Sequence, residues 1–193
     1  MSNTETLVFV GDSLTQAGDW ASWFPDDDVV NLGVGGDTVA DLTERIGDVI
    51  AARPDSVVLM IGTNDVGARR SVEQVVRGIE NLMVVMRREL PGTRLLLQSI
   101  APRQAEFAAR IKDANRHLRQ FSSTVRAQYL DLWPALAGDD DALRPEFSDD
   151  GVHLTAAGYE AWLAELRPGL ERLRDEPPMS RPLTVIDSSY EID

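Results

Sequence analysis

The sequence predicts an α/β fold in which helices cover both faces of a parallel β-sheet, and three observations lead to this prediction. Short apolar runs alternate along the chain with longer segments whose apolar residues recur at helical spacing. The short runs are unbroken rather than alternating with polar residues, as expected for strands buried on both faces. Glycines or a proline close these runs, and strands that alternate with helices favour parallel pairing through crossover helices.

Five apolar runs are predicted to be strands. The first four end at Gly11, at the glycine cluster 33–36, at Gly62 and at Pro102. The strands are expected at residues 7–10, 29–32, 56–61, 94–100 and 128–132.

Four longer segments are predicted to be helices. Ser71 is a suitable N-cap for one that runs to Leu90, and Pro91-Gly92 ends it. Another carries a single apolar stripe from Phe107 to Val125. The helices are expected at residues 38–51, 71–90, 104–125 and 155–173.

Length and composition narrow the class of protein. The 193 residues fit one domain, predicted at 1–174, followed by an acidic, proline-containing tail at 175–193. The net charge of −13 disfavours nucleic acid as a partner, because phosphate binding needs clustered Lys and Arg. The absence of cysteine removes disulfides, thiol catalysis and cysteine-bound zinc. The sequence carries no signal of oligomeric state.

The apolar runs are too short for a membrane span, which needs about 20 apolar residues. Residues 1–6 carry no basic cluster, and no apolar signal core follows them. We therefore expect a cytoplasmic protein, although a processed exported form would have the same sequence.

Three glycine-containing segments are predicted to meet at one edge of the sheet. Gly11-Asp12-Ser13-Leu14, Gly35-Gly36-Asp37-Thr38 and Gly62-Thr63-Asn64-Asp65 each follow a predicted strand. Ligands of parallel sheets bind beyond the carboxyl ends of the strands. The topology alone therefore predicts a ligand site at this edge.

Ser13 has two interpretations. At a tight strand-to-helix turn it is either a helix N-cap or a nucleophile whose hydroxyl faces solvent. It does not lie in the Gly-x-Ser-x-Gly elbow of the α/β-hydrolases, because position 15 is Thr, and that fold is therefore disfavoured.

A nucleophilic serine needs a base, and the chain has two histidines. His117 lies beside the apolar stripe of a long helix and is interpreted as a partly exposed surface residue. His153 lies in a loop, and Asp150 stands three residues before it, close enough to hold one imidazole tautomer. In the alternative interpretation Asp150-Gly151 is a turn, Thr155 caps the next helix, and His153 is incidental.

A developing oxyanion needs hydrogen-bond donors. The backbone N–H of Gly36, the side-chain amide of Asn64 and the backbone N–H of Ser13 are the candidates at the predicted edge. In the alternative interpretations Gly36 serves a left-handed turn and Asn64 caps a local turn.

Other sequence patterns are weaker indications of a functional site. Residues 33–38 resemble a dinucleotide-binding loop but lack its third glycine and follow the second strand. The acidic runs 26–28 and 139–141 have no calcium-loop pattern and are interpreted as solvated loops. A metal-dependent phosphoesterase remains an alternative; its candidate ligands are Asp12, Asp65, Asp150 and His153.

Taken together, these residues resemble the SGNH hydrolases, also called GDSL-type esterases or lipases. Four blocks of that family occur in order, and the resemblance covers roughly residues 7–173. They are Gly11-Asp12-Ser13-Leu14, the glycine Gly36 before Asp-Thr, Gly62-Thr63-Asn64-Asp65, and Asp150-Gly151-Val152-His153.

The resemblance implies a three-layer α/β/α flavodoxin-like fold, here with a five-stranded parallel sheet, and neither metal nor cofactor. It implies Ser13, Asp150 and His153 as the catalytic triad, and Ser13, Gly36 and Asn64 as the oxyanion donors. The expected function is hydrolysis of small carboxylic esters, with short acyl or acetyl groups, through an acyl-enzyme. The alternatives are an acyl-thioesterase or lysophospholipase of the same family, or a non-catalytic ligand-binding module on the same fold.

Overall fold

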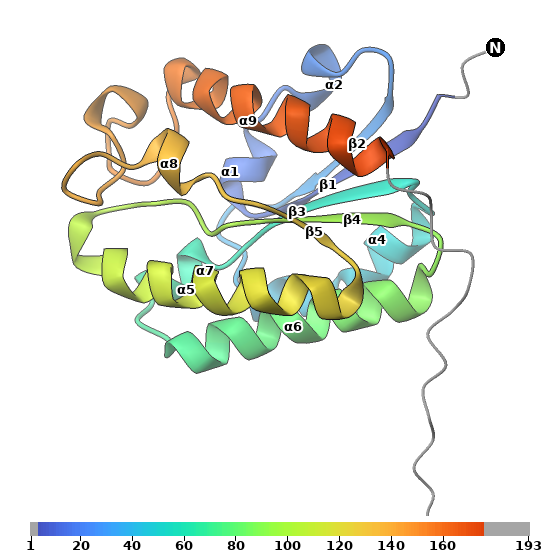
Figure 1. Cartoon of the computed structure of the whole chain (residues 1–193), viewed down its shortest axis with the longest axis horizontal. Helices are drawn as coiled ribbons and strands as arrows, with labels where there is room; N and C mark the ends of the chain where they lie inside the picture. Colours follow the sequence, from blue (N-terminus) through green and yellow to red (C-terminus); the bar gives the residue numbers. More distant parts are fainter. Residues whose placement is uncertain (1–3, 176–193) are drawn as a thin grey trace, which may run out of the picture.

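The structure is a computed structural model, which describes residues 4–175 (Figure 1). In this part of the chain five strands form one parallel sheet in the order β2-β1-β3-β4-β5. This order confirms the predicted α/β fold and is the flavodoxin-like one, in which the chain changes direction between β1 and β3. The strands are β1 (Thr6–Gly11), β2 (Asp28–Gly33), β3 (Ser56–Met60), β4 (Arg94–Gln98) and β5 (Gln128–Leu130).

One face of the sheet is covered by α3 to α7, drawn below the sheet in Figure 1. Val8 and Val10 of β1 point into this layer and pack in one apolar cluster with the long helices. The elements of this layer are α3 (Val39–Glu44), α4 (Ile46–Ala51), α5 (Thr63–Gly67), α6 (Val72–Glu89), η1 (Ala105–Phe107), α7 (Ala108–Ser122) and η2 (Ser123–Val125).

The other face is covered by α1, α2, α8 and α9. Leu7 and Phe9, which alternate with the valines of β1, point into this layer. Its centre is aromatic: Trp20 stacks on Phe9 with ring centroids 4.2 Å apart and meets Trp162 edge-on at 5.0 Å. The elements are α1 (Ser13–Gln16), α2 (Trp20–Trp23), α8 (Trp133–Leu136), η3 (Pro145–Phe147) and α9 (Ala156–Asp175).

Helix α6 begins as the sequence predicts. Ser71 accepts a hydrogen bond from the N–H of Gln74, and the Gln74 side chain accepts one from the N–H of Ser71. This reciprocal capping box satisfies two N–H groups that have no partner within the helix.

The helix predicted at 38–51 is wrong as a continuous element, because it is divided into α3 and α4 at Arg45. Arg45 has φ −107° and ψ 15°, outside the helical range. Its guanidinium turns back to the Asp37 carboxylate at 2.6 Å and to the Gly11 carbonyl oxygen at 3.1 Å. The helix is therefore interrupted at the residue that forms an ion pair at the sheet edge, although the helical spacing of apolar residues continues past it.

The ends of two strands also differ from the prediction. β4 stops at Gln98, and the N–H of Ile100 donates to the side chain of Asn115 instead of to a strand. β5 stops at Leu130.

None of the helices within residues 4–175 is long and apolar enough to cross a membrane. The cytoplasmic location stays a prediction. Apart from Asp175, the last residue of α9, the predicted tail lies outside the described residues, and the domain boundary at 174 therefore stays a prediction as well.

Candidate active site

The carboxyl edge of the sheet brings together all the predicted site residues. Ser13 begins α1 directly after β1, Gly36 lies in the turn after β2, and Asn64 lies in α5 after β3. Asp150 and His153 lie in the loop that precedes α9. Five residues from four segments of the chain thus meet at one edge, as parallel topology requires.

Ser13 is not the N-cap of its helix, so that interpretation is wrong. The cap is Asp12, whose Oδ1 accepts from the N–H of Leu14 at 3.0 Å. Gly11 lets β3 and α1 approach closely, since a β-carbon there would lie 2.2 Å from the carbonyl oxygen of Met60 and 2.3 Å from Thr15 Oγ1. With the cap supplied by Asp12, the Ser13 hydroxyl has no role in starting the helix.

The Ser13 hydroxyl instead contacts His153. Ser13 Oγ lies 3.1 Å from His153 Nε2, and His153 Nδ1 lies 2.7 Å from Asp150 Oδ2. An ionised carboxylate only accepts hydrogen bonds, so Nδ1 carries the proton of the neutral ring. Nε2 then has a free lone pair toward the hydroxyl, which is the arrangement needed for general-base activation of a serine.

The turn 148–153 holds Asp150 in position. Asp150 Oδ1 accepts from the N–H of Val152 at 2.8 Å and from that of His153 at 2.7 Å. Ser148 Oγ donates to the same oxygen at 3.2 Å and accepts from the N–H of Gly151 at 2.9 Å. Gly151 has φ +76°, a conformation that glycine adopts without strain. The turn occupies one carboxylate oxygen and leaves the other for the imidazole.

Hydrogen bonds keep Asp150 ionised. The bond from the His153 ring, followed by those from the N–H groups of His153 and Val152, holds the pKa of Asp150 well below its usual range. The side chains of His153 and Asp150 are 59% and 55% exposed. Asp150 is therefore ionised, as its role beside the His153 ring requires, and both side chains are open to a ligand.

The three predicted oxyanion donors lie on segments at this edge of the sheet. Asn64 Nδ2 donates to the carbonyl oxygen of Asp37 at 2.9 Å, and because a carbonyl only accepts, this bond fixes which way the amide points. The second hydrogen of that amide group stays available. Within residues 4–175, the backbone N–H groups of Ser13 and Gly36 donate to no protein acceptor. Gly36 has φ +84°, and its α-carbon faces open space.

Near these donors lie Arg45 and Asp37, to which the sequence analysis gave no role, and Asp65, which it considered as a metal ligand. The Arg45–Asp37 pair ties the β2 turn to the end of β1, as described above. Asp65 is 1% exposed, and its Oδ2 accepts from the N–H of Val39 at 2.9 Å, which joins α5 to α3. Asp37 and Asp65 lie inside the glycine-containing segments, so position along the chain was the signal that pointed to them.

Two further contacts hold α1. Tyr159 of α9 donates to the carbonyl oxygen of Leu14 at 2.7 Å, and burial raises the pKa of its hydroxyl to about 12. Asp12 is 1% exposed, and burial raises the pKa of its carboxyl to about 7 against the opposing hydrogen bond from Leu14. The neighbouring carboxylates of Asp37 and Asp65 add to that rise.

The four acidic or imidazole groups considered as metal ligands have other partners. Asp12 caps α1, Asp65 accepts from Val39, and Asp150 and His153 bond to each other. Across residues 4–175, no group of three or more His, Asp or Glu side chains is arranged to hold a metal ion.

Two other predictions concern residues away from the triad. His117 is half exposed on α7 and lies 3.7 Å from Asp113 of the same helix, as its interpretation as a surface residue predicts. The acidic run 26–28 is wrong as a simple solvated loop: Asp27 accepts two 2.7 Å bonds from Arg174 of α9, and its side chain is 9% exposed. Asp141 of the second run pairs with Lys112.

The sequence model of the GDSL-like lipase/acylhydrolase family matches residues 9–161 of the chain. The chain belongs to this hydrolase family. The resemblance drawn from the four sequence blocks is thereby confirmed.

Two relatives illustrate the likeness in sequence. Platelet-activating factor acetylhydrolase IB subunit alpha2 of Homo sapiens is 25% identical over 190 residues, covering 93% of this chain and 82% of that protein. The protein of the same name from Gallus gallus is 26% identical over 182 residues, covering 89% and 79%.

Solved structures establish the likeness in fold. A GDSL-like lipase from Bacteroides thetaiotaomicron superposes with a TM-score of 0.76 at 23% identity, covering 87% of this chain and 88% of that one. An acetylxylan esterase from Geobacillus stearothermophilus gives a TM-score of 0.72 at 23% identity, covering 92% and 97%. Both share the three-layer architecture of the GDSL-type hydrolase described here.

Proposed function

We propose that the protein is a serine esterase that hydrolyses carboxylic esters with short acyl groups through an acyl-enzyme. The observation that carries the proposal is the continuous contact from Ser13 Oγ to His153 Nε2 and from His153 Nδ1 to Asp150 Oδ2. The three residues take the roles of nucleophile, general base and orienting carboxylate.

In the first half-reaction Ser13 Oγ attacks the ester carbonyl carbon while His153 Nε2 takes the hydroxyl proton. The carbonyl π electrons move to oxygen, and the oxyanion accepts from the N–H groups of Ser13 and Gly36 and from the Asn64 amide. When the intermediate collapses, the C–O bond to the alcohol breaks and the leaving alkoxide takes the proton from His153. The acyl group stays on Ser13.

The second half-reaction repeats these steps with water. His153 Nε2 takes a proton from water as the oxygen attacks the acyl carbon, and the same donors bind the oxyanion. Collapse breaks the bond to Ser13 Oγ, which recovers the proton. Asp150 stays ionised throughout, since its hydrogen bonds hold its pKa well below the usual range.

The surroundings of Ser13 favour a small acyl group. A β-carbon at Gly35 would lie 2.8 Å from Gln16 Oε1 and 4.0 Å from the Ser13 β-carbon. Glycine therefore keeps the space beside Ser13 open, and the polar side chain of Gln16 lies next to that space. A long acyl chain would need a larger apolar surface beside the serine. The names of the platelet-activating factor acetylhydrolases and the acetylxylan esterase both specify acetyl groups, which supports the same choice.

Two experiments test the proposal. We expect the wild type to hydrolyse p-nitrophenyl acetate faster than the butyrate, Ser13→Ala to have no activity above background, and Asn64→Ala to lose ~10²–10³ in kcat. A fluorophosphonate probe should label the wild type and leave Ser13→Ala unlabelled.

Three results would redirect the assignment. A folded Ser13→Ala variant with wild-type activity contradicts the proposal. No hydrolysis and no labelling of the wild type indicates the non-catalytic binding module. Faster turnover of acyl thioesters or lysophospholipids than of p-nitrophenyl acetate indicates the corresponding alternative within the family.

A further inference from the structure

The segment after β4 contacts two parts of the candidate active site, helix α5 with Asn64 and the turn with Asp150 and His153, although it contributes none of the five site residues. Arg103 makes a polar side-chain contact to α5, and Gln104 makes one to the Asp150 turn. The backbone of Arg103 is bonded to another loop, because its carbonyl oxygen accepts a hydrogen bond from the N–H of Leu143 at 3.0 Å. This bond helps to hold the backbone from which the two side chains extend.

Arg103 contacts the helix that carries Asn64. Its Nη1 donates to the carbonyl oxygen of Thr63 at 2.8 Å, and its guanidinium lies 4.6 Å above the centre of the Phe107 ring. Gly67 makes room for this approach, since a β-carbon there would lie 2.5 Å from Nη1. The guanidinium is therefore held from two directions against α5.

Gln104 contacts the turn that carries His153. Its Nε2 donates to the carbonyl oxygen of Asp150 at 3.2 Å, and its Oε1 accepts from Arg103 Nε at 2.9 Å. Arginine only donates hydrogen bonds, so Arg103 forces the amide oxygen toward itself and the amide nitrogen toward Asp150. Gly151 again leaves the space, since a β-carbon there would lie 3.3 Å from the Gln104 Cγ and Nε2.

Resting on the proposed function, we infer that Arg103 and Gln104 are positioning residues that hold the Asp150–His153 turn in register with α5. The hydrogen bonds run without a break from Thr63 through Arg103 and Gln104 to Asp150. The base and the Asn64 donor therefore share one support. The side chains of Asp150 and His153 are more than half exposed, so packing against the core does not fix them. Catalytic groups must be held within about 0.5 Å of their working positions, which gives such a support a purpose.

Substitutions of Gln104 test this support. Gln104→Glu keeps an acceptor for Arg103 but presents no donor to the Asp150 carbonyl, while Gln104→Ala removes both contacts. We expect each to lower kcat for p-nitrophenyl acetate by ~10-fold with KM changed less than twofold, and to slow fluorophosphonate labelling of Ser13 by the same factor. Rates are normalised to the folded fraction measured by near-UV circular dichroism.

Amide hydrogen exchange supplies a readout that does not depend on activity. The N–H groups of Val152 and His153 are bonded to Asp150 Oδ1, and a loosened turn should exchange them ~10-fold faster in both Gln104 variants. The matched control is Arg69→Ala. Arg69 also lies over the Phe107 ring, at 5.7 Å, but its side chain pairs with Glu106 and is 70% exposed. This control should leave kcat and exchange at wild-type values.

The outcomes separate the two levels of inference. Wild-type kcat and wild-type exchange in Gln104→Glu overturn the positioning role, and a raised KM at unchanged kcat overturns it in favour of substrate contact. A wild type that neither hydrolyses esters nor reacts with the probe overturns the proposed function. In that case the exchange comparison still decides whether Gln104 holds the turn.

Discussion

At the amino edge of the sheet a buried arginine is bonded to backbone carbonyl groups, whereas at the carboxyl edge the Asp150–His153 pair stays open to solvent. The Arg87 guanidinium is 3% exposed and donates to four carbonyl oxygens, those of Pro91, Thr93, Val125 and Arg126. In contrast, His153 and Asp150 are more than half exposed. Both edges depend on directed hydrogen bonds, and at the carboxyl edge the backbone N–H groups of Ser13 and Gly36 have no protein acceptor within residues 4–175.

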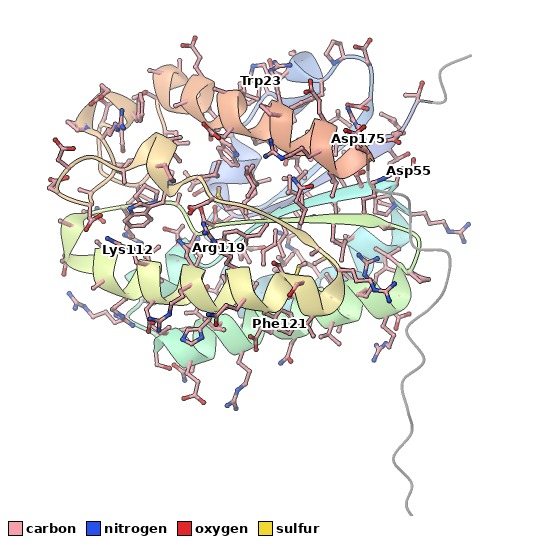
Figure 2. The ribbon with its side chains drawn as sticks, viewed as in Figure 1. Trp23, Asp55, Lys112, Arg119, Phe121 and Asp175 are labelled. Carbon is pink, nitrogen blue, oxygen red and sulfur yellow. The ribbon has the colours of Figure 1, made fainter. Side chains whose placement is uncertain are left out.

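Other charged side chains at the amino edge of the sheet also form hydrogen bonds. Figure 2 shows Asp55, which precedes β3, and Asp175, which ends α9, at the amino edge, and Asp55 Oδ2 accepts from the N–H of Thr6 at 2.8 Å. Arg174 and Asp27 form an ion pair at another part of that edge. The comparison indicates that substitutions at the amino edge change stability, and that those at the carboxyl edge change activity.

The largest expected effect is loss of activity without loss of stability. His153→Ala should lower kcat/KM for p-nitrophenyl acetate by ~10⁴-fold or more, because the serine loses its base. The free energy of unfolding should change by less than ~0.5 kcal/mol, since the side chain is exposed. Initial rates and urea titration measure the two quantities. A decrease in activity below 10-fold is incompatible with the proposed role.

Arg87→Met should give the opposite result at the amino edge. The change leaves four carbonyl groups without their charged donor, and we expect the free energy of unfolding to fall by about 3 kcal/mol or more. The rate per folded molecule should stay unchanged. Urea titration measures the loss, with Arg88→Met as the control, because Arg88 is 63% exposed and forms an ion pair with its neighbour Glu89. Equal losses in the two variants would refute this account of Arg87.

Gly36→Ala should affect both properties by smaller amounts. A β-carbon finds open space at this position, but φ +84° strains an alanine by about 1–2 kcal/mol. Relief of that strain turns the peptide plane and moves the N–H, so kcat should fall by ~10-fold. Gly47→Ala is the control: it also meets open space, lies inside α4, and should stabilise the protein slightly without changing kcat. Unchanged kcat in Gly36→Ala would argue against this N–H as an oxyanion donor.

Asp12→Asn should produce an effect on stability that is visible as a pH dependence. The pKa of Asp12 rises from 3.8 to about 7 on folding, so the folded state binds this proton more tightly than the unfolded state. Wild-type stability therefore falls relative to the Asn variant as the pH rises from about 4 through 7, and the difference becomes constant above about pH 8. At about 1.4 kcal/mol per pKa unit, we expect a change of about 4 kcal/mol across that window.

Thermal unfolding of both proteins at pH 4, 5.5, 7 and 8 measures the difference. Asparagine retains the oxygen that caps α1, so the cap itself is not lost. The lowered pKa of Asp150 acts in the opposite direction and below pH 4, and it is common to both proteins. A difference that does not vary between pH 4 and pH 7 would show that Asp12 is ionised in the folded state.

Sequence patterns predicted the elements whose signals are regular. The unbroken apolar runs of β1 and β3 and the Ser71 N-cap of α6 need only local chemistry and burial, and they were placed correctly. The one-turn helices α1, α2, α5 and α8 were not predicted, because four or five residues show no helical period. Their positions depend on tertiary contacts, such as the bond from Tyr159 to α1.

The candidate site was predictable where it follows topology and unpredictable where it depends on side-chain direction. Ser13, Gly36 and Asn64 follow strand ends, so a parallel sheet gathers them. Arg45 looked like an ordinary helical residue, and its return to Asp37 has no sequence signal. The hydrogen bond from Gln104 to Asp150 joins residues 46 positions apart in the chain, and no sequence pattern links the two.

The contact between Ser13 and His153 joins residues 140 positions apart in the chain. During synthesis at about 5–20 residues per second, the serine leaves the ribosome roughly 7–28 s before the histidine. For that interval the nascent chain carries the proposed nucleophile without the proposed base. A polypeptide that ends before His153 therefore lacks one partner of this contact, and the proposed activity requires the segment before the last helix.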